Sequence, residues 1–204
     1  MGKLILLMLV GLACLPVRAD TVLLMGDSIS AGYGLPAGRG WENLLREKLG
    51  QMNANYTLAN ASISGETSAG GSARLDQELA LHHPAVVILE LGANDGLRGM
   101  PPAQLEANLA SMIQRCRAAG ARVLLLGMRL PPNYGARYYE SYAAVYPRLA
   151  EKTGSSFVPF LMEEFAADPA WFQADGVHPN ETAQPLMFEK VWAKLAALLP
   201  GGKP

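Results

Sequence analysis

The sequence is poor in cysteine, and its two cysteines, Cys14 and Cys116, lie far apart. Cys14 falls in the N-terminal apolar segment described below, so removal of that segment leaves Cys116 without a partner for an internal disulfide. No group of cysteines and histidines has the spacing of zinc ligands. Neither a disulfide framework nor a zinc site of this kind is therefore expected.

An excess of charge of one sign is also lacking. The 204 residues include 17 basic and 18 acidic residues, with a formal net charge of −1 and no long run of either sign. A protein that binds nucleic acid or an anionic membrane carries a basic surface that this composition does not provide. Half of the residues are hydrophobic, which at this length suffices to fill the core of one domain.

Several nucleotide-binding and hydrolase signatures are missing as well. The sequence has no P-loop, and Gly32-Tyr33-Gly34 is not completed to a Gly-x-Gly-x-x-Gly turn. Segment 26–30, Gly26-Asp27-Ser28-Ile29-Ser30, ends in serine where the α/β-hydrolase elbow ends in glycine. These absences argue against a dinucleotide-binding turn and against the α/β-hydrolase arrangement.

Residues 1–19 have the pattern of a secretory signal peptide. Lys3 gives a basic start, residues 4–15 are almost wholly apolar, and residues 16–19 end in the small residue Ala19. An apolar run of about a dozen residues is too short to cross a bilayer comfortably. We therefore predict a signal peptide at 1–19, one domain at 20–204, a periplasmic or secreted location and no stable membrane anchor. Lipidation of Cys14 is an alternative, but Gly11 stands where a lipobox has an aliphatic residue.

Short apolar runs alternate with segments of helical periodicity through the rest of the chain. Residues 85–91 form a continuous aliphatic run, as expected of a strand buried on both faces at the centre of a parallel sheet. Further strands are predicted at 21–25, 56–59, 122–128 and 156–159, and helices near 41–50, 73–83, 102–119, 138–152 and 183–199, with another helix opening at 27–30. This rhythm predicts the α/β class, with a flavodoxin-like parallel sheet in a three-layer α/β/α sandwich.

A serine near one end of the chain and an acid–histidine pair near the other are candidates for catalysis. Ser28 follows the first predicted strand, where a helix start favours negative charge. Asp175 precedes His178 by three residues across Gly176, so one tight turn can place the carboxylate beside a ring nitrogen. Serine, histidine and aspartate are the parts of an acyl-transfer site. The alternatives are a helix N-cap for Ser28 and a capped turn for the pair.

Other polar or glycine positions follow or end predicted strands. Gly65 allows a substrate oxygen to approach its N–H, although many loop glycines serve backbone freedom alone. Asn94 can donate to an oxyanion or form an Asx turn with Asp95. Glu90, inside the aliphatic run, is expected to be partnered or to face the ligand-binding edge, and Asp27 to be a turn or cap residue.

Four blocks of the sequence together resemble, in order, those of the SGNH or GDSL hydrolase family. They are segments 26–30, 60–67, 92–95 and 175–178, and Ile29 stands where the family usually has leucine. Segments 90–99 and 129–135 further resemble secreted bacterial thioesterase and lysophospholipase members of the family. The resemblance implies the SGNH hydrolase fold over 20–204, with neither cofactor nor metal.

The resemblance also implies a role for each matching residue. Ser28 would be the nucleophile, His178 the base and then the acid, and Asp175 the residue that orients the histidine. The oxyanion hole would consist of the backbone N–H groups of Ser28 and Gly65 and the side chain of Asn94.

The implied activity is that of a serine esterase acting on a small-molecule substrate. Aryl or short-to-medium acyl esters, acyl-CoA and lysophospholipids would be hydrolysed through an acyl-enzyme by what we expect to be a monomer. An apolar acyl groove is expected between segments 96–101 and 130–138, unless these are ordinary packed surface loops. Its predicted lining is Leu97, Met100, Pro131, Pro132 and Tyr134.

Two rival functions remain open from the sequence. Asp27, Asp95, Asp175 and His178 are candidate ligands for a metal-dependent hydrolase. The other rival is an envelope protein that keeps this fold and binds acyl ligands without hydrolysing them.

Overall fold

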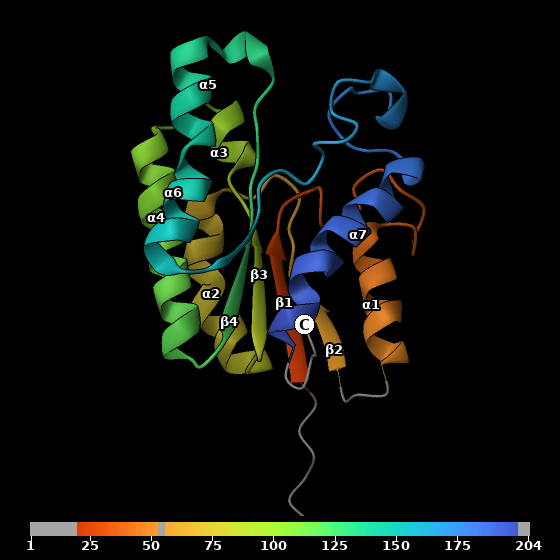
Figure 1. The fold of residues 1–204 in the computed structure, drawn as a ribbon, viewed down its shortest axis with the longest axis vertical. Helices are drawn as coiled ribbons and strands as arrows, with labels where there is room; N and C mark the ends of the chain where they lie inside the picture. The colour runs from red at the N-terminus through yellow and green to blue at the C-terminus, as the bar shows by residue number, and fades with distance from the viewer. Residues whose placement is uncertain (1–19, 53–55, 200–204) are drawn as a thin grey trace, which may run out of the picture.

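The computed structural model describes residues 20–52 and 56–199 (Figure 1). The predicted signal peptide at 1–19 lies outside the described residues and stays a prediction. Of the helices in the described part of the chain, none combines the length and the apolarity that crossing a bilayer requires.

Five parallel strands form one sheet in the order β2-β1-β3-β4-β5. All five predicted strands are confirmed, and their bounds are β1 (Asp20–Gly26), β2 (Tyr56–Asn60), β3 (Val86–Glu90), β4 (Arg122–Leu126) and β5 (Ser156–Val158). Every residue of β3 is buried, because helices cover both faces of the sheet.

Helices pack on both faces of this sheet, so the predicted α/β/α sandwich is confirmed (Figure 1). Helices α1 (Trp41–Gln51) and α7 (Gln184–Leu195) contact each other on one face. The other face carries α2 (Ser68–His82), α4 (Pro102–Ala118) and α6 (Val145–Thr153). The shorter elements are α3 (Ala93–Leu97), α5 (Ala136–Ala143), η1 (Pro132–Tyr134), η2 (Pro169–Trp171), η3 (Glu181–Ala183) and η4 (Ala196–Leu198).

Two helix predictions are wrong in detail. No helix opens at 27–30; residues 28–34 form successive turns, in which Gly32 and Gly34 have φ of +69° and +73°. Such left-handed backbone cannot continue a right-handed helix. The single helix predicted at 138–152 is divided at Ala144 into α5 and α6. Pro147 lacks an N–H and so cannot donate to the carbonyl of Ala143 across this junction.

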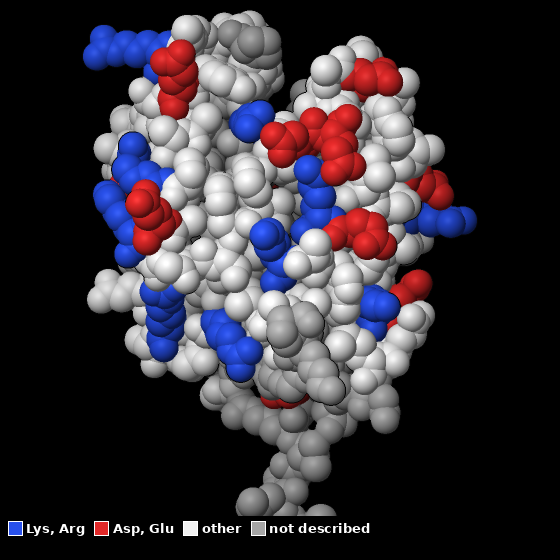
Figure 2. All heavy atoms as spheres, in the orientation of Figure 1, with Lys and Arg blue, Asp and Glu red and all other residues white. Residues whose placement is uncertain are grey.

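The strand order predicts a ligand-binding site at the carboxyl ends of the strands. Chain order reverses between β1 and β3, and ligands of open parallel sheets bind at such a point, outside the carboxyl ends of the strands. The segments that follow β1, β2 and β3 all leave the sheet at this edge. Figure 2 shows the molecule notched at its top, and on the same face Lys and Arg side chains are interspersed with Asp and Glu.

Substitution of Ile88 tests the packing of the central strand. Ile88 is fully buried in β3, between Leu24 of β1 and Leu124 of β4. Because the sheet cannot collapse into the space, Ile88→Val should cost about 0.5–1.5 kcal/mol of unfolding free energy and Ile88→Ala about 2–5 kcal/mol, measured by urea denaturation. Leu81→Ala is the control, since Leu81 is 68% exposed. Equal costs for the two Ile88 variants would contradict this packing.

Candidate active site

Asp175 and His178 are held together within one tight turn. Asp175 Oδ1 accepts from the N–H of Val177 at 2.9 Å and of His178 at 3.0 Å, and Oδ2 lies 2.7 Å from His178 Nδ1. Gly176 has φ +67°, a backbone conformation that favours glycine. The turn is thus shaped so that the carboxylate orients the ring.

The same contacts act on the acidity of Asp175. The backbone N–H groups of His178 and Val177, followed by the His178 ring, lower the pKa of Asp175 to about 2. The carboxylate is therefore ionised throughout the pH range in which an imidazole can act as a base.

The other ring nitrogen of His178 reaches Ser28 from 150 residues away in the chain. His178 Nε2 lies 2.9 Å from Ser28 Oγ. Tyr33, from the turns after Ser28, places its ring centroid 4.6 Å from that of His178. No helix begins at Ser28, so the N-cap alternative is wrong, and the hydroxyl faces the histidine instead.

Gly65 occupies the third position of a turn after β2. Glu66 N donates to Ile63 O at 3.1 Å, and Gly65 has φ +80°, as a type II turn requires. Two side chains then hold successive carbonyls of this turn: Arg98 Nη2 donates to Gly65 O and Asn94 Nδ2 to Glu66 O, both at 3.0 Å. The segment after β3 therefore fixes the shape of the segment after β2.

Two backbone N–H groups lie in the segments that follow β1 and β2. Among the described residues, neither the backbone N–H of Ser28 nor that of Gly65 donates to another group. Asn94 Nδ2, beside its bond to Glu66 O, donates to Asp27 Oδ2 at 3.1 Å. The amide of Asn94 thus faces the turn after β1 rather than forming an Asx turn with its neighbour.

A fully buried carboxyl lies beneath these groups. Glu90, the last residue of β3, accepts through Oε2 from Ser30 Oγ at 2.7 Å and from Asp27 N at 3.2 Å. Glu90 was predicted to be partnered or to face this edge, and it is partnered. Gly26 pairs with Glu90 in the sheet register, and a Cβ at Gly26 would lie 2.7 Å from Oε2. Glycine at position 26 therefore makes room for the Glu90 carboxyl.

Burial governs the ionisation of this acidic pair. Burial and the nearby Asp27 raise the pKa of Glu90 well above its usual range. Burial also raises the pKa of Asp27 to about 6, against the opposing effect of the Ile29 N–H. Ionisation of both carboxyls together is therefore disfavoured at this site.

Comparison with known proteins identifies the family. A model described as the GDSL-like Lipase/Acylhydrolase family matches residues 24–184. The chain belongs to this family. It is 53% identical over 181 residues to "Esterase TesA" of Pseudomonas aeruginosa, covering 89% of this chain and 90% of that one. It is 45% identical over 193 residues to "Thioesterase 1/protease 1/lysophospholipase L1" of Escherichia coli, covering 95% and 91%.

Solved structures of family members have the same fold. A crystal structure of TesA matches with a TM-score of 0.85 at 53% identity, over 88% of this chain and all of that one. Psychrotrophic esterase EstA from Pseudoalteromonas, inhibited by monoethylphosphonate, matches with a TM-score of 0.81 at 39% identity, over 86% and 96%. The family predicted from four sequence blocks is confirmed, and with it the assignment to the serine esterases of the GDSL type.

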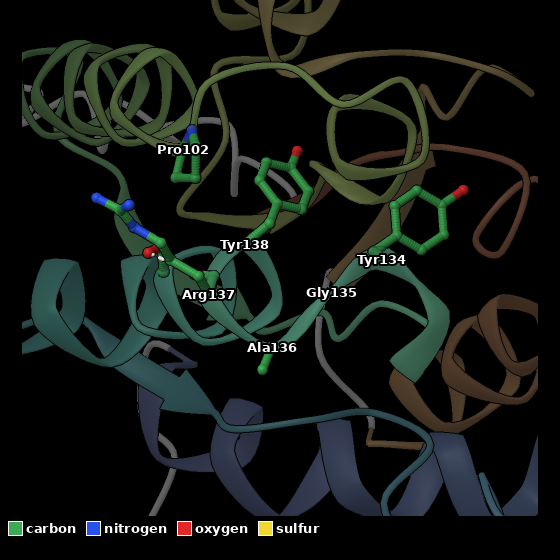
Figure 3. Close-up of a pocket in the computed structure, with 7 residues that line it drawn as sticks. Pro102, Tyr134, Gly135, Ala136, Arg137 and Tyr138 are labelled. Carbon is green, nitrogen blue, oxygen red and sulfur yellow. Dashed lines mark hydrogen bonds between the residues drawn. The ribbon is translucent and has the colours of Figure 1, made fainter.

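The loops predicted to form an acyl groove do contact each other. Tyr134 OH donates to Leu97 O at 3.2 Å, and Tyr138 OH donates to Met100 O at 2.7 Å. Both tyrosines point from η1 and α5 toward the loop after α3, as Figure 3 shows. They line a surface hollow of about 480 Å³, together with Pro102, Gly135, Ala136, Arg137 and Ser141.

Only part of the predicted groove lining coincides with this hollow. Tyr134 lines it, whereas Leu97, Met100 and Pro131 are not among the described residues that do. Leu97 and Pro131 are exposed and Met100 is half-buried. The side chain of Pro132 lies outside what the structure describes.

The four candidate ligands of the rival metal site have other partners. Asp95 accepts from the N–H and hydroxyl of Ser68, and Asp27 accepts from Ile29 N and the Asn94 amide. Asp175 accepts from its own turn, and the two ring nitrogens of His178 contact Asp175 and Ser28. Among the described residues, no three His, Cys, Asp or Glu side chains are grouped so as to share a metal ion.

Sequence reasoning missed four residues that contact the site: Tyr33, Arg98, Gln173 and Gln184. Gln173 stands two residues before Asp175, and Tyr33 lies in a glycine-rich loop, so proximity in sequence was a weak signal for these two. No pattern in the sequence marks Arg98 or Gln184, because Arg98 donates to the carbonyl of Gly65 and Gln184 accepts from the N–H of Trp41, both main-chain groups of distant segments.

The raised pKa of Glu90 can be tested by the pH dependence of stability. A carboxyl whose folded-state pKa is raised keeps a proton that the unfolded chain releases, so its contribution weakens as pH rises. The variant Glu90→Gln cannot titrate, and its stability relative to wild type should therefore increase between pH 4 and pH 8 in urea denaturation.

Glu106→Gln is the matched control with the opposite sign. Hydrogen bonds from Arg148 and Lys152 lower the pKa of Glu106, so its contribution is present above the unfolded pKa and is lost as pH falls. This variant should lose stability relative to wild type as pH rises. A difference between Glu90→Gln and wild type that is the same at every pH would contradict a raised pKa of Glu90.

Proposed function

We propose that this protein hydrolyses carboxylic esters and thioesters through an acyl-enzyme intermediate on Ser28. His178 is the general base and then the general acid, and Asp175 orients its ring. The observation that carries the proposal is the relay in which His178 lies 2.9 Å from Ser28 Oγ and 2.7 Å from Asp175 Oδ2.

In the first half-reaction Ser28 Oγ attacks the carbonyl carbon of the substrate. His178 Nε2 accepts the hydroxyl proton, and Asp175 stabilises the imidazolium that forms. When the tetrahedral intermediate collapses, the proton passes from His178 to the leaving alcohol or thiol. In the second half-reaction, water deprotonated by His178 attacks the acyl carbon. The bond to Ser28 Oγ then breaks, His178 returns the proton to Oγ, and the acid is released.

The negative charge on the carbonyl oxygen needs hydrogen-bond donors at the same edge. The unused N–H groups of Ser28 and Gly65 and the amide of Asn94 are the proposed donors. Both hydrogens of Asn94 Nδ2 already serve Asp27 Oδ2 and Glu66 O. The oxyanion must therefore share or replace one of these two hydrogen bonds. The bond to Asp27 is the nearer candidate, because Asp27 directly precedes Ser28 in the chain.

The names of the relatives indicate the substrate class. They include an esterase, a thioesterase and lysophospholipase, and an arylesterase from Vibrio mimicus. We propose aryl or short-to-medium acyl esters, acyl thioesters and lysophospholipids as substrates, with the acyl chain directed toward the loop after α3 and segment 130–138. The predicted signal peptide supports a periplasmic or secreted site of action.

Asn94→Ala should slow turnover by about two to three orders of magnitude, because it removes one oxyanion donor. The measurement is kcat on a p-nitrophenyl ester. Asn43→Ala on α1, where the amide donates to Glu42 Oε1, is the control and should retain full activity. Unchanged kcat in Asn94→Ala would remove Asn94 from the mechanism.

A serine-directed phosphonate separates the proposed reaction from its rivals. Wild type should be labelled at Ser28 and inactivated, whereas Ser28→Ala should be neither labelled nor active. Activity abolished by a chelator, without phosphonate labelling, would indicate the metal-dependent hydrolase. Binding of acyl ligands without hydrolysis of any ester would indicate the binding protein.

Leu97→Ala should lower kcat/KM selectively for long acyl chains. Each methylene that packs on an apolar wall contributes about 0.8 kcal/mol, or roughly fourfold in kcat/KM. In a series of p-nitrophenyl esters from acetate to laurate, the acetate rate should stay unchanged while the laurate rate falls. Leu81→Ala, at the C-terminal end of α2, is the control. A chain-length profile identical to that of wild type would place the groove elsewhere.

A further inference from the structure

The turn that carries Asp175 and His178 belongs to a segment without regular strands. Its internal shape is set by main-chain bonds, in which Gln173 N donates to His178 O at 2.8 Å and Gly176 N to Gln173 O at 2.9 Å. These bonds lie within the turn. They do not determine how far the His178 ring stands from Ser28.

The side chain of Gln173 joins this turn to the turns that follow Ser28. Its Nε2 donates to Tyr33 O at 2.8 Å and to Pro179 O, the carbonyl after His178, at 3.2 Å. Tyr33 is itself tied to the serine, because its N–H donates to Ser28 O at 3.1 Å. One amide group thus connects the main chain beside the nucleophile with the main chain beside the base.

The surroundings of Gly34 show how closely the Gln173 side chain lies against the turns that follow Ser28. A Cβ at Gly34 would lie 2.0 Å from Gln173 Oε1, and Gly34 has φ +73°. The glycine therefore allows the amide of Gln173 to lie against the backbone next to Tyr33.

A second glutamine holds the same carbonyl from the other side. Gln184, only 2% exposed, donates through Nε2 to Asn180 O at 3.0 Å and to Pro179 O at 3.4 Å. Its Oε1 accepts from Trp41 N, at the start of α1, at 3.0 Å. Pro179 O therefore receives two amide donors, one connected to the turns after Ser28 and the other to a core helix.

We propose that Gln173 is a positioning residue for the reaction proposed above, and that its carboxamide sets the distance between His178 Nε2 and Ser28 Oγ. This inference rests on the proposed function. The hydrogen bonds of the Gln173 side chain within the described residues go to Tyr33 O and Pro179 O rather than to the hydroxyl or the ring, so it acts through the position of the turn. The two N–H hydrogens of an amide can each donate to one of the two carbonyl oxygens. A carboxylate has no hydrogen to donate, and its oxygens would be repelled by these carbonyls.

The test compares Gln173→Leu and Gln173→Glu with wild type on one p-nitrophenyl ester. A misplacement of about 1 Å at a reacting group can cost about 100-fold in rate. We expect kcat to fall about 10- to 100-fold in both variants, with KM within about twofold of wild type. The second-order rate of phosphonate labelling at Ser28 should fall by the same factor.

Two controls separate positioning from loss of structure or of substrate binding. Gln104→Leu removes a glutamine whose amide donates to Asn108 on α4, and its kcat should stay at the wild-type value. In the Ser28→Ala background, adding Gln173→Leu should leave the Kd of an uncleaved ester unchanged. Gln173→Asn, which keeps a polar side chain but is one methylene short, should also lose kcat, and it provides a second variant if Gln173→Leu fails to fold.

The inference is overturned if Gln173→Leu, or Gln173→Asn in its place, keeps kcat within twofold of wild type, or if the loss appears only in KM. Failure of the proposed function has a different signature, namely wild type that is neither labelled nor active. In that case the ring resonances of His178 in NMR spectra decide the inference. They should shift or broaden in Gln173→Leu and not in Gln104→Leu, and identical spectra would contradict the positioning role.

Discussion

The parallel pairing of β1 with β3 is the contact on which the rest of this structure depends. Its register places Gly26 beside Glu90, so both strands end at the same level. The two segments that leave them therefore run side by side, with Ser28 on one and Asn94 on the other. Pairing of β2 with the other edge of β1 adds the Gly65 turn. Three of the four family blocks meet because three neighbouring parallel strands end together.

The carboxyl pair at this edge illustrates how a site costs stability. Glu90 is fully buried and its Oε1 has no partner among the described residues, a condition that disfavours the folded state. The same group receives Asp27 N and Ser30 Oγ, on either side of Ser28, and so shapes the turn that presents the hydroxyl. Asp27 in turn orients Asn94. The buried acid thus bonds the residues on both sides of Ser28 and, through Asp27, is linked to Asn94.

The histidine reaches the site by a different physical route. Its turn comes from a segment between β5 and α7 that belongs to no strand of the sheet and is closed by an isolated antiparallel bridge between Phe172 and Pro179. Its place depends instead on two glutamine amides, the Tyr33 ring contact and the bonds within the turn. The hydrogen bond between Ser28 and His178 therefore joins a residue positioned by the sheet to a residue positioned by side-chain contacts.

The sequence by itself determined the layers and the local turns. Aliphatic runs such as 85–91 specify buried strands because only a parallel sheet covered on both faces hides them, and Asp175-Gly176-Val177-His178 contains its own turn. Only the tertiary structure decided the turns at 28–34, where the backbone of Gly32 and Gly34 is incompatible with a helix, and the contacts that Arg98 and Gln173 make with Gly65 O and Tyr33 O. Those contacts end on main-chain carbonyls, which every residue possesses. A sequence therefore cannot mark which carbonyl a distant side chain will reach.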